Sequence, residues 1–247
     1  MTDPALAPSS PAADAAGAAR RPTVLVTGAT RGIGRAVLEE LAADHHLIVG
    51  GRDAEAVAAV VAELPSAQPF VAELTDAEQI AAAVDALRLP HGLDGLVHSA
   101  GVLVSGRLED LEPAAWERSF AINVTAVAAL TRLLLPALRT ARGTVVTINS
   151  GNGFTAKAGG GAYAASKFAL RALTDALREE ERAAGVRVTS VHPGRVATDM
   201  QRELRNFEQG EYREQDYVAP STVAATVGLA LRMGDEASLD VLSVRPR

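Results

Sequence analysis

The sequence predicts an α/β fold in which a doubly wound parallel sheet is covered by helices on both faces. Short runs rich in β-branched residues alternate with longer Ala- and Leu-rich runs of helical periodicity from Pro22 onward. No linker rich in Pro, Gly or Ser and no repeat of fixed period interrupts residues 22–247. This strict alternation predicts parallel strands joined by right-handed crossovers within one domain.

The expected strands are short and apolar, such as Thr-Val-Leu-Val-Thr at 23–27 and Thr-Val-Val-Thr-Ile at 144–148. Continuous apolar runs of this length are typical of strands buried on both faces. The expected strands cover 23–27, 47–50, 68–71, 93–98, 144–148, 186–191 and 239–244.

The expected helices fill the stretches between these strands and are rich in Ala and Leu, which are strong helix formers. Asp53 is a favoured N-cap residue for the second helix, and Pro113 suits the first turn of the fourth. The expected helices cover 32–43, 53–64, 76–87, 113–140, 163–184 and 221–233.

Residues 1–21 consist mainly of Ala, Pro, Ser and Asp, with no basic start and no continuous apolar block. This composition argues against a secretory signal and predicts a flexible tail ahead of a single dinucleotide-binding domain at 22–247. No later run is expected to reach the ~20 apolar residues that span a bilayer. We therefore expect no membrane partner.

The overall composition narrows the choice of partners. The net charge of −6 over 247 residues argues against a nucleic acid or an anionic membrane. The absence of cysteine excludes disulfides and thiolate zinc sites and fits a cytoplasmic location. His45 and His46 are expected to lie in a solvated loop, so no metal site is predicted.

A glycine-rich turn, Thr-Gly-Ala-Thr-Arg-Gly-Ile-Gly at 27–34, joins the first expected strand to the first expected helix. A pyrophosphate at a helix N-terminus must approach backbone N–H groups, so side chains have to be absent there. Gly28 would permit the tight turn, Gly32 the close approach and Gly34 the packing of helix on sheet. The turn therefore predicts a Rossmann-type dinucleotide site.

The end of the second expected strand bears on the choice of cofactor. An acid there would bind the ribose hydroxyls of NAD, whereas arginine accommodates the 2′-phosphate of NADP(H). Gly51 occupies the usual place of the acid, Arg52 follows, and Arg31 approaches from the glycine turn. Asp53 either caps the following helix or holds the ribose. The two arginines favour NADP(H), with NAD as the alternative.

Tyr163 and Lys167 lie four residues apart and therefore share one face of a helix. A neighbouring ammonium is expected to lower the pKa of a tyrosine and bring it closer to acid–base chemistry near neutrality. Ser150 directly follows the fifth strand, where open α/β sheets form their ligand crevice. Asn123 lies inside an expected helix, either as a functional residue or as an exposed or back-bonded helical asparagine.

Together these residues resemble the short-chain dehydrogenase/reductase family, in its compact form of roughly 250 residues. The resemblance runs from about Thr23 to the C-terminal end and includes the glycine turn and a Pro-Gly turn after the sixth strand. It implies Asn123, Ser150, Tyr163 and Lys167 as the catalytic residues. It implies cofactor contacts at Gly28, Thr30, Arg31, Gly32, Ile33, Gly34, Arg52, Glu73, Leu74, Ser99, Ala100, Gly101, Tyr163, Lys167, Pro193, Gly194, Val196 and Thr198.

The resemblance also implies a mechanism. Tyr163 would give a proton to a carbonyl oxygen as NADPH delivers hydride, and Lys167 would hold the nicotinamide ribose and assist Tyr163. Ser150 would orient the carbonyl, and Asn123 would anchor a water that relays protons through Lys167. Two positions depart from the family pattern: His98 stands where Asn is usual, in a strand-stabilising role, and Glu73 replaces the Asp that contacts adenine.

We therefore expect an NADPH-dependent ketone or aldehyde reductase, with an NAD-linked alcohol dehydrogenase or a non-catalytic cofactor-sensing regulator as alternatives. The partner would be a small carbonyl or alcohol, recognised by residues 102–112, 151–161 and 199–217, the last as a mobile lid. Apolar helices at 113–140 and 162–184 predict a homodimer or homotetramer.

Overall fold

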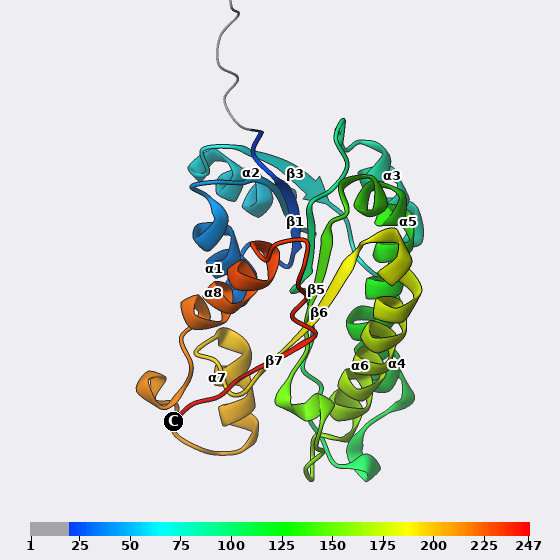
Figure 1. The fold of residues 1–247 in the computed structure, drawn as a ribbon. Coiled ribbons are helices and arrows are strands. Elements are labelled where there is room, and N and C mark those ends of the chain that lie inside the picture. The colour runs from blue at the N-terminus through cyan, green and yellow to red at the C-terminus, as the bar shows by residue number, and fades with distance from the viewer. Residues whose placement is uncertain (1–19) are drawn as a thin grey trace, which may run out of the picture.

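The computed structural model describes residues 20–247, which form one seven-stranded sheet in the order β3-β2-β1-β4-β5-β6-β7 (Figure 1). All neighbouring strands are parallel. Successive strands run outward from β1 in one direction up to β3, and from β4 onward in the other. The predicted fold class is confirmed. Most of the predicted tail, residues 1–19, lies outside the described residues.

The strands and helices follow the sequence pattern closely. The strands are β1 (Thr23–Thr27), β2 (His46–Gly51), β3 (Ala67–Val71), β4 (Gly95–His98), β5 (Thr144–Ile148), β6 (Arg187–Pro193) and β7 (Val241–Val244). The α-helices are α1 (Gly32–Leu41), α2 (Ala54–Glu63), α3 (Ala77–Asp85), α4 (Pro113–Phe120), α5 (Ala126–Ala141), α6 (Gly161–Glu181), α7 (Asp199–Phe207) and α8 (Pro220–Leu231).

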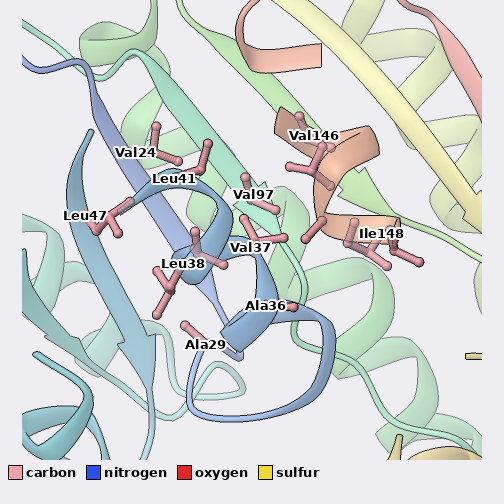
Figure 2. Close-up of a cluster of buried hydrophobic side chains, with 14 of the residues drawn as sticks. Val24, Ala29, Ala36, Val37, Leu38, Leu41, Leu47, Val97, Val146 and Ile148 are labelled. Atoms are coloured by element: carbon pink, nitrogen blue, oxygen red, sulfur yellow. The ribbon is translucent and has the colours of Figure 1, made fainter. Parts of the chain in front are cut away.

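Alternate residues of the central strands face two separate apolar layers. On one face, Val24 and Val97 pack with Val37 and Leu41 of α1 (Figure 2), and α2 and α8 complete this layer. On the other face, Leu25 packs in a second layer with buried side chains of α3, α5 and α6. Helices cover the sheet on both sides (Figure 1). This arrangement leaves the carboxyl ends of the strands open as the place where open α/β sheets bind ligands.

The run Pro113–Ala141 is long and apolar enough, by length and composition, to cross a membrane. The expectation that no run reaches this threshold is therefore wrong. Leu130, Leu134 and Leu138 of this run are buried in the second apolar layer. A core helix passes the same test as a membrane span, and packing against the sheet accounts for these apolar residues.

The predicted continuous helix over 113–140 is interrupted by a π-helical turn, η2 (Ala121–Thr125). A π turn accommodates an extra residue within a helix and often occurs at functional sites. Asn123 sits at the centre of this turn and is buried. The turn thus separates α4 from α5 and marks the residue that the sequence singled out within the helix.

Two smaller expectations are corrected. His45 is buried beside Asp44, with its Nδ1 2.6 Å from Oδ1, and His46 begins β2 with its Nδ1 2.8 Å from Ser66 Oγ, so the pair does not form a solvated loop. Arg20, at the end of the predicted tail, pairs with Asp94 at 2.7 Å. Between residues 20 and 247, no cluster of three or more His, Cys, Asp or Glu side chains is arranged for a metal.

Candidate active site

Two adjoining cavities open at the carboxyl ends of the strands. The glycine-turn cavity, about 670 Å³, is lined by the turn after β1 and by the ends of β2, β3 and β4. The catalytic cavity, about 570 Å³, is lined by the end of β5, the start of α6 and the loop after β6. Ile33, Ser99, Gly101, Val102, Leu103, Thr198 and Met200 line both cavities. The two therefore form one continuous crevice.

Most of the predicted site residues line this crevice, but two do not. Gly34 packs behind the glycine turn, and Asn123 is buried behind the wall. The glycine-turn cavity is lined by Gly28, Thr30, Arg31, Gly32, Ile33, Arg52, Glu73, Leu74, Ser99, Ala100, Gly101 and Thr198. The catalytic cavity is lined by Ser150, Tyr163, Lys167, Pro193, Gly194, Val196 and Thr198.

The glycine turn has the room that a dinucleotide requires. Gly28 has φ +61°, and a Cβ there would lie 2.8 Å from Ala100 Cα. A Cβ at Gly34 would run into the Gly28 carbonyl oxygen. Gly32, the first residue of α1, has φ +57°, and a Cβ there would meet only Thr198 Cγ2, at 3.6 Å. The N-terminal end of α1 therefore faces open space. The residues present therefore fit a pyrophosphate at the N-terminus of α1.

A second feature of the wall also fits a bound group. Gln201 on α7 lines the catalytic cavity, and its side chain is 5% exposed. Its Nε2 is the sole buried side-chain nitrogen or oxygen in residues 20–247 without a hydrogen-bond partner. Buried polar groups are rarely left in this state, so a ligand atom is a natural partner for this amide.

Thr27 joins the ends of β1 and β4 beneath the crevice, a role that the sequence did not reveal. Its Oγ1 accepts hydrogen bonds from the backbone N–H groups of Ser99 at 3.1 Å and Ala100 at 3.2 Å. Thr27 is buried, so these bonds are shielded from water. They fix the backbone of residues 99–100 where it crosses the floor of the glycine-turn cavity.

The end of β2 decides between the two roles considered for Asp53. Its Oδ1 accepts a hydrogen bond from Ala56 N at 3.0 Å, which makes Asp53 the N-cap of α2. A Cβ at Gly51 would lie 2.7 Å from Val57 Cγ2 and 3.3 Å from Thr30 Cγ2. No acidic side chain therefore stands at position 51, and the neighbouring carboxylate is engaged by the helix.

Arg31 and Arg52 line the same cavity, and each faces an acid. Arg31 Nη1 lies 3.6 Å from Asp199 Oδ2, and Arg52 Nη1 lies 3.7 Å from Glu73 Oε2. The two arginine side chains are 76% and 78% exposed. Exposed pairs at this separation contribute little free energy, so both guanidinium groups are free to exchange their partner for a phosphate.

The catalytic cavity contains Tyr163 and Lys167, one turn apart on α6. Both are buried, with 8% and 4% of their surface exposed. Lys167 Nζ donates to the Ile148 carbonyl oxygen at 3.0 Å and lies 5.8 Å from the centroid of the Tyr163 ring. Ser150 caps the short 3₁₀ turn η3 (Gly151–Gly153) and accepts a hydrogen bond from Asn152 N at 3.1 Å.

Burial dominates the protonation of both groups. It raises the pKa of Tyr163 above its ordinary value, while a hydrogen bond with Ser150 lowers it by less. It lowers the pKa of Lys167 to about 8. The expectation that Lys167 lowers the pKa of Tyr163 is wrong here, because desolvation outweighs any effect of the ammonium. At neutral pH, Tyr163 keeps its proton and Lys167 its charge.

The sequence matches a known family over most of its length. A profile of the family described as short chain dehydrogenase matches residues 22–209. The chain belongs to the short-chain dehydrogenase family. The members of this family share the Rossmann-type sheet described above, as the comparison with solved structures also shows.

Several known proteins are similar to this chain. A 3-alpha-(or 20-beta)-hydroxysteroid dehydrogenase of Mycobacterium bovis is 36% identical over 181 residues, 71% of this chain and 69% of that protein. A glycine betaine reductase of Emericella nidulans is 32% identical over 234 residues; these are 90% of this chain and only 18% of that relative. The structure of a metagenomic short-chain oxidoreductase in complex with NADP has a TM-score of 0.77 and 30% identity, covering 92% of this chain and 97% of that one.

Asn123 of this short-chain dehydrogenase ties the crevice wall together. Its Oδ1 accepts from Val102 N at 3.0 Å, and its Nδ2 donates to the Val102 carbonyl oxygen and to Ser166 Oγ, both at 3.0 Å. The exposed-helix alternative is thus wrong, because the residue is 1% exposed. Both N–H groups of its Nδ2 are engaged by protein acceptors, so the side-chain amide is held in place.

The two departures from the family pattern have structural explanations. His98, at the end of β4, is buried, and its Nε2 lies 2.8 Å from Thr131 Oγ1. Burial lowers its pKa to about 3, so it stays neutral and serves the strand-stabilising role expected of it. Glu73 accepts hydrogen bonds from Thr75 N and Oγ1 at 3.3 and 3.2 Å through Oε1, while Oε2 faces Arg52.

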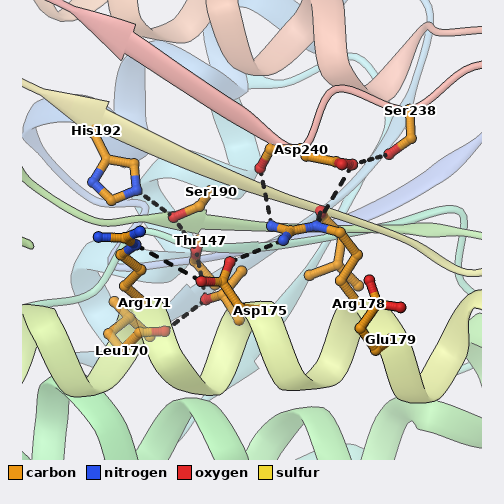
Figure 3. A network of polar contacts seen from close by, with 12 residues as sticks. Thr147, Leu170, Arg171, Asp175, Arg178, Glu179, Ser190, His192, Ser238 and Asp240 are labelled. Carbon is orange, nitrogen blue, oxygen red and sulfur yellow. Dashed lines mark hydrogen bonds and ion pairs between the residues drawn. The ribbon is translucent and has the colours of Figure 1, made fainter.

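His192, on β6 directly before Pro193-Gly194, is a residue that the sequence analysis missed. Figure 3 shows its ring above Ser190, at the end of a hydrogen-bonded series that reaches α6. Its Nδ1 lies 2.9 Å from the Ser150 carbonyl oxygen and its Nε2 lies 2.8 Å from Ser190 Oγ. A carbonyl only accepts, so Nδ1 carries the proton and Nε2 accepts from Ser190. His192 thereby fixes the backbone of Ser150.

The segment 199–217, expected as a mobile lid, carries the helix α7 and the 3₁₀ turn η5 (Glu214–Asp216). Thr198 caps α7 by accepting from Gln201 N at 3.4 Å. Arg202 lies 3.9 Å from the centroid of the Tyr212 ring. The charged residues of this segment thus hold its two halves together, a pattern that the sequence alone did not reveal.

Proposed function

We propose that this short-chain dehydrogenase is an NADPH-dependent carbonyl reductase that acts on a ketone or aldehyde. The observation that carries the proposal is the buried, protonated Tyr163 beside Ser150 at the floor of the catalytic cavity. A phenol that keeps its proton at neutral pH can serve as the general acid in the reduction of a carbonyl. The group needed to protonate the developing alkoxide is therefore present in the cavity beside Ser150.

The glycine turn, Thr198 and Lys167 would hold the dinucleotide, which supplies the hydride when it is bound. Ser150 Oγ would donate a hydrogen bond to the substrate carbonyl oxygen. Tyr163 would give its phenolic proton to the same oxygen as negative charge develops there. Lys167, charged at neutral pH and one helical turn from Tyr163, would stabilise the phenolate that remains.

The preference for NADP(H) over NAD rests on charge and shape at the end of β2. Gly51 offers no carboxylate, and the carboxylate of Asp53 is held by the cap of α2. Arg31 and Arg52 stand on the same cavity with long, exposed ion pairs. A 2′-phosphate would attract both guanidinium groups through charge-assisted hydrogen bonds, which are stronger than exposed pairs with single carboxylates.

The direct test follows oxidation of NADPH and of NADH against a panel of ketones, aldehydes and quinones. We expect turnover with at least one member of the panel, at higher kcat/KM with NADPH. Turnover confined to alcohols with NAD⁺ would replace the proposal with the NAD-linked alternative. Tight NADPH binding without turnover of any carbonyl or alcohol would favour the cofactor-sensing regulator instead.

We also propose that the enzyme forms a homodimer or homotetramer through α5 and α6. Phe168 on α6 is 43% exposed, and Leu133 on α5 is only partly covered by its own chain. Large apolar side chains exposed on neighbouring helices are typical of subunit contacts. Light scattering at micromolar concentration should give a multiple of the monomer mass, and Phe168→Glu should lower it. A parent protein with the monomer mass would contradict this proposal.

A further inference from the structure

Arg245, the residue after β7, lies at the substrate end of the crevice. β7 pairs with β6 so that Val244 is opposite Pro193, and Gly194 N donates to the Val244 carbonyl oxygen at 2.7 Å. This bond fixes the exit of β7 next to the Pro-Gly turn. Arg245 and Pro246 both line the catalytic cavity, together with Ser150 and Tyr163.

Two glycines make the room for this segment. A Cβ at Gly151 would lie 2.5 Å from Arg245 Nη1, and a Cβ at Gly194 would lie 2.9 Å from Pro246 Cδ. Neither glycine has a positive φ, so the backbone does not require glycine at these positions. At Gly194 the Pro246 ring leaves no room for a Cβ, and at Gly151 a Cβ would displace the Arg245 guanidinium. The guanidinium group therefore rests directly against the residue that follows Ser150.

The charge around Arg245 is unbalanced. Glu208 is the one carboxylate among the described residues that line the catalytic cavity. It is already bound by Arg195 at 2.6 and 2.9 Å and by Arg205 at 2.6 Å, and these bonds hold its pKa below the ordinary value. Within residues 20–247, Arg245 forms no ion pair. Lys157 and Lys167 also line this cavity, so cations outnumber carboxylates in it.

We propose that Arg245 binds a carboxylate group of the substrate, which would make the substrate a short oxo acid. An uncompensated guanidinium at a ligand cavity is suited to bidentate recognition of a carboxylate. Ser150 and Arg245 line the same cavity, and the guanidinium lies against Gly151, the residue after Ser150. A short carbon chain is therefore expected to join the carboxylate at Arg245 to the carbonyl at Ser150. This inference rests on the proposed carbonyl reductase activity and names its substrate class.

Paired substrates test it through turnover. Pyruvate, acetoacetate, levulinate and 5-oxohexanoate are each compared with their methyl esters, with NADPH as the reductant. The parent should favour the acid over its ester by at least about tenfold in kcat/KM at one chain length. Arg245→Gln should remove that preference by lowering kcat/KM for the acid alone, and Arg245→Lys should restore part of it. Arg247→Gln, in the same segment but off the cavity, should behave as the parent.

Binding gives a readout that does not depend on turnover. Calorimetric titration of the same acids and esters into the complex with NADP⁺, which cannot reduce them, should show tighter binding of one acid in the parent and no such difference in Arg245→Gln. Reduction of neutral ketones without any preference for acids would overturn the role of Arg245 and leave the reductase standing. Selective binding of an acid without reduction would overturn the reductase and leave the anion site standing. A thermal melt of each variant checks that it is folded.

Discussion

The two halves of the crevice hold their functional side chains in different ways. On the catalytic side, Asn123, Tyr163 and Lys167 are all at most 8% exposed, and Asn123 and Lys167 are fixed by hydrogen bonds of about 3.0 Å. On the side of the glycine turn, Arg31 and Arg52 are 76% and 78% exposed and lie 3.6 and 3.7 Å from their acids. The catalytic side chains are therefore held in place by the protein itself, while the proposed selection of cofactor would rely on side chains that are free to move.

This difference has an energetic basis. The hydrogen bonds of a buried hydroxyl or ammonium are stronger because the local dielectric constant is low. A buried polar group without a partner costs free energy, so neighbouring groups have to hold it. An exposed arginine loses little free energy when it leaves a long ion pair, and a phosphate can then accept two charge-assisted hydrogen bonds from it. We therefore expect substitutions on the catalytic side to act on kcat, and those at the arginines to act on the choice between NADPH and NADH.

The largest effect is expected from Tyr163→Phe. The ring would still pack in the catalytic cavity, but the proton donor would be gone, and general acid catalysis typically contributes about 10²–10⁴-fold. Turnover should fall by that range, while the dissociation constant for NADPH, measured by fluorescence titration, should change little. A variant with nearly normal kcat would show that Tyr163 is not the acid.

On the other side of the comparison, Arg52→Ala should lower kcat/KM with NADPH by about tenfold or more and leave the value with NADH nearly unchanged. Glu73→Gln should act in the opposite direction on NADPH, because it removes the carboxylate that now faces Arg52. Arg182→Ala, an exposed arginine paired with Glu179 that lines neither cavity, is the control. Equal losses with both cofactors in Arg52→Ala would mean that this residue supports the fold instead.

The pH dependence of kcat should show whether the charge of Lys167 takes part in catalysis. Its pKa of about 8 means that it is charged at pH 7 and mostly neutral at pH 9. If the charge assists Tyr163, kcat for carbonyl reduction should fall about tenfold between these values. Lys167→Arg, which stays charged, should flatten this alkaline limb even if its overall rate is lower. A profile of the parent that stays flat to pH 9.5 would remove Lys167 from the acid–base chemistry.

The last prediction concerns stability, not turnover, and involves His98, which is buried at the end of β4. The folded chain keeps His98 neutral down to about pH 3, whereas an unfolded chain would protonate it near its ordinary value of 6.5. Between these values the unfolded chain binds the extra proton, so stability is lost as the pH falls. The free energy of unfolding of the parent, measured in urea, should fall between pH 7.5 and 5. In His98→Asn the fall should be smaller by about 2 kcal/mol. Equal drops in both proteins would contradict this.

Much of the fold and of the site was predictable because short stretches of sequence carry it. The β-branched runs become strands within a few residues of their expected ends, since continuous apolar runs suit a parallel sheet buried on both faces. The glycine turn and the four-residue spacing of Tyr163 and Lys167 are likewise local patterns. Each of these patterns can be recognised in the sequence because local backbone geometry alone determines the structure that it forms.

The features that were missed or misjudged depend on contacts between distant segments. The pKa of Tyr163 is raised because the fold buries it away from water. The residues next to it in the sequence do not indicate this burial. His45 looked solvated beside His46 but is covered by tertiary packing. Arg245 reaches Gly151 only because β7 pairs with β6, and His192 reaches Ser150 only because β6 pairs with β5. Partners of this kind follow from strand order, which the periodicity of a sequence does not specify.

The π turn at Asn123 gives the helix around it an unusual sensitivity to length. An α-helix advances about 100° per residue, so removing one residue from 121–125 would let α4 and α5 merge into a regular helix. The same deletion would turn α4 against α5 by that angle and pull the amide of Asn123 away from Val102 and Ser166. The helical segment would gain regular hydrogen bonds while the crevice lost its brace. At this one place in the chain, a more regular helix and a working enzyme are competing outcomes.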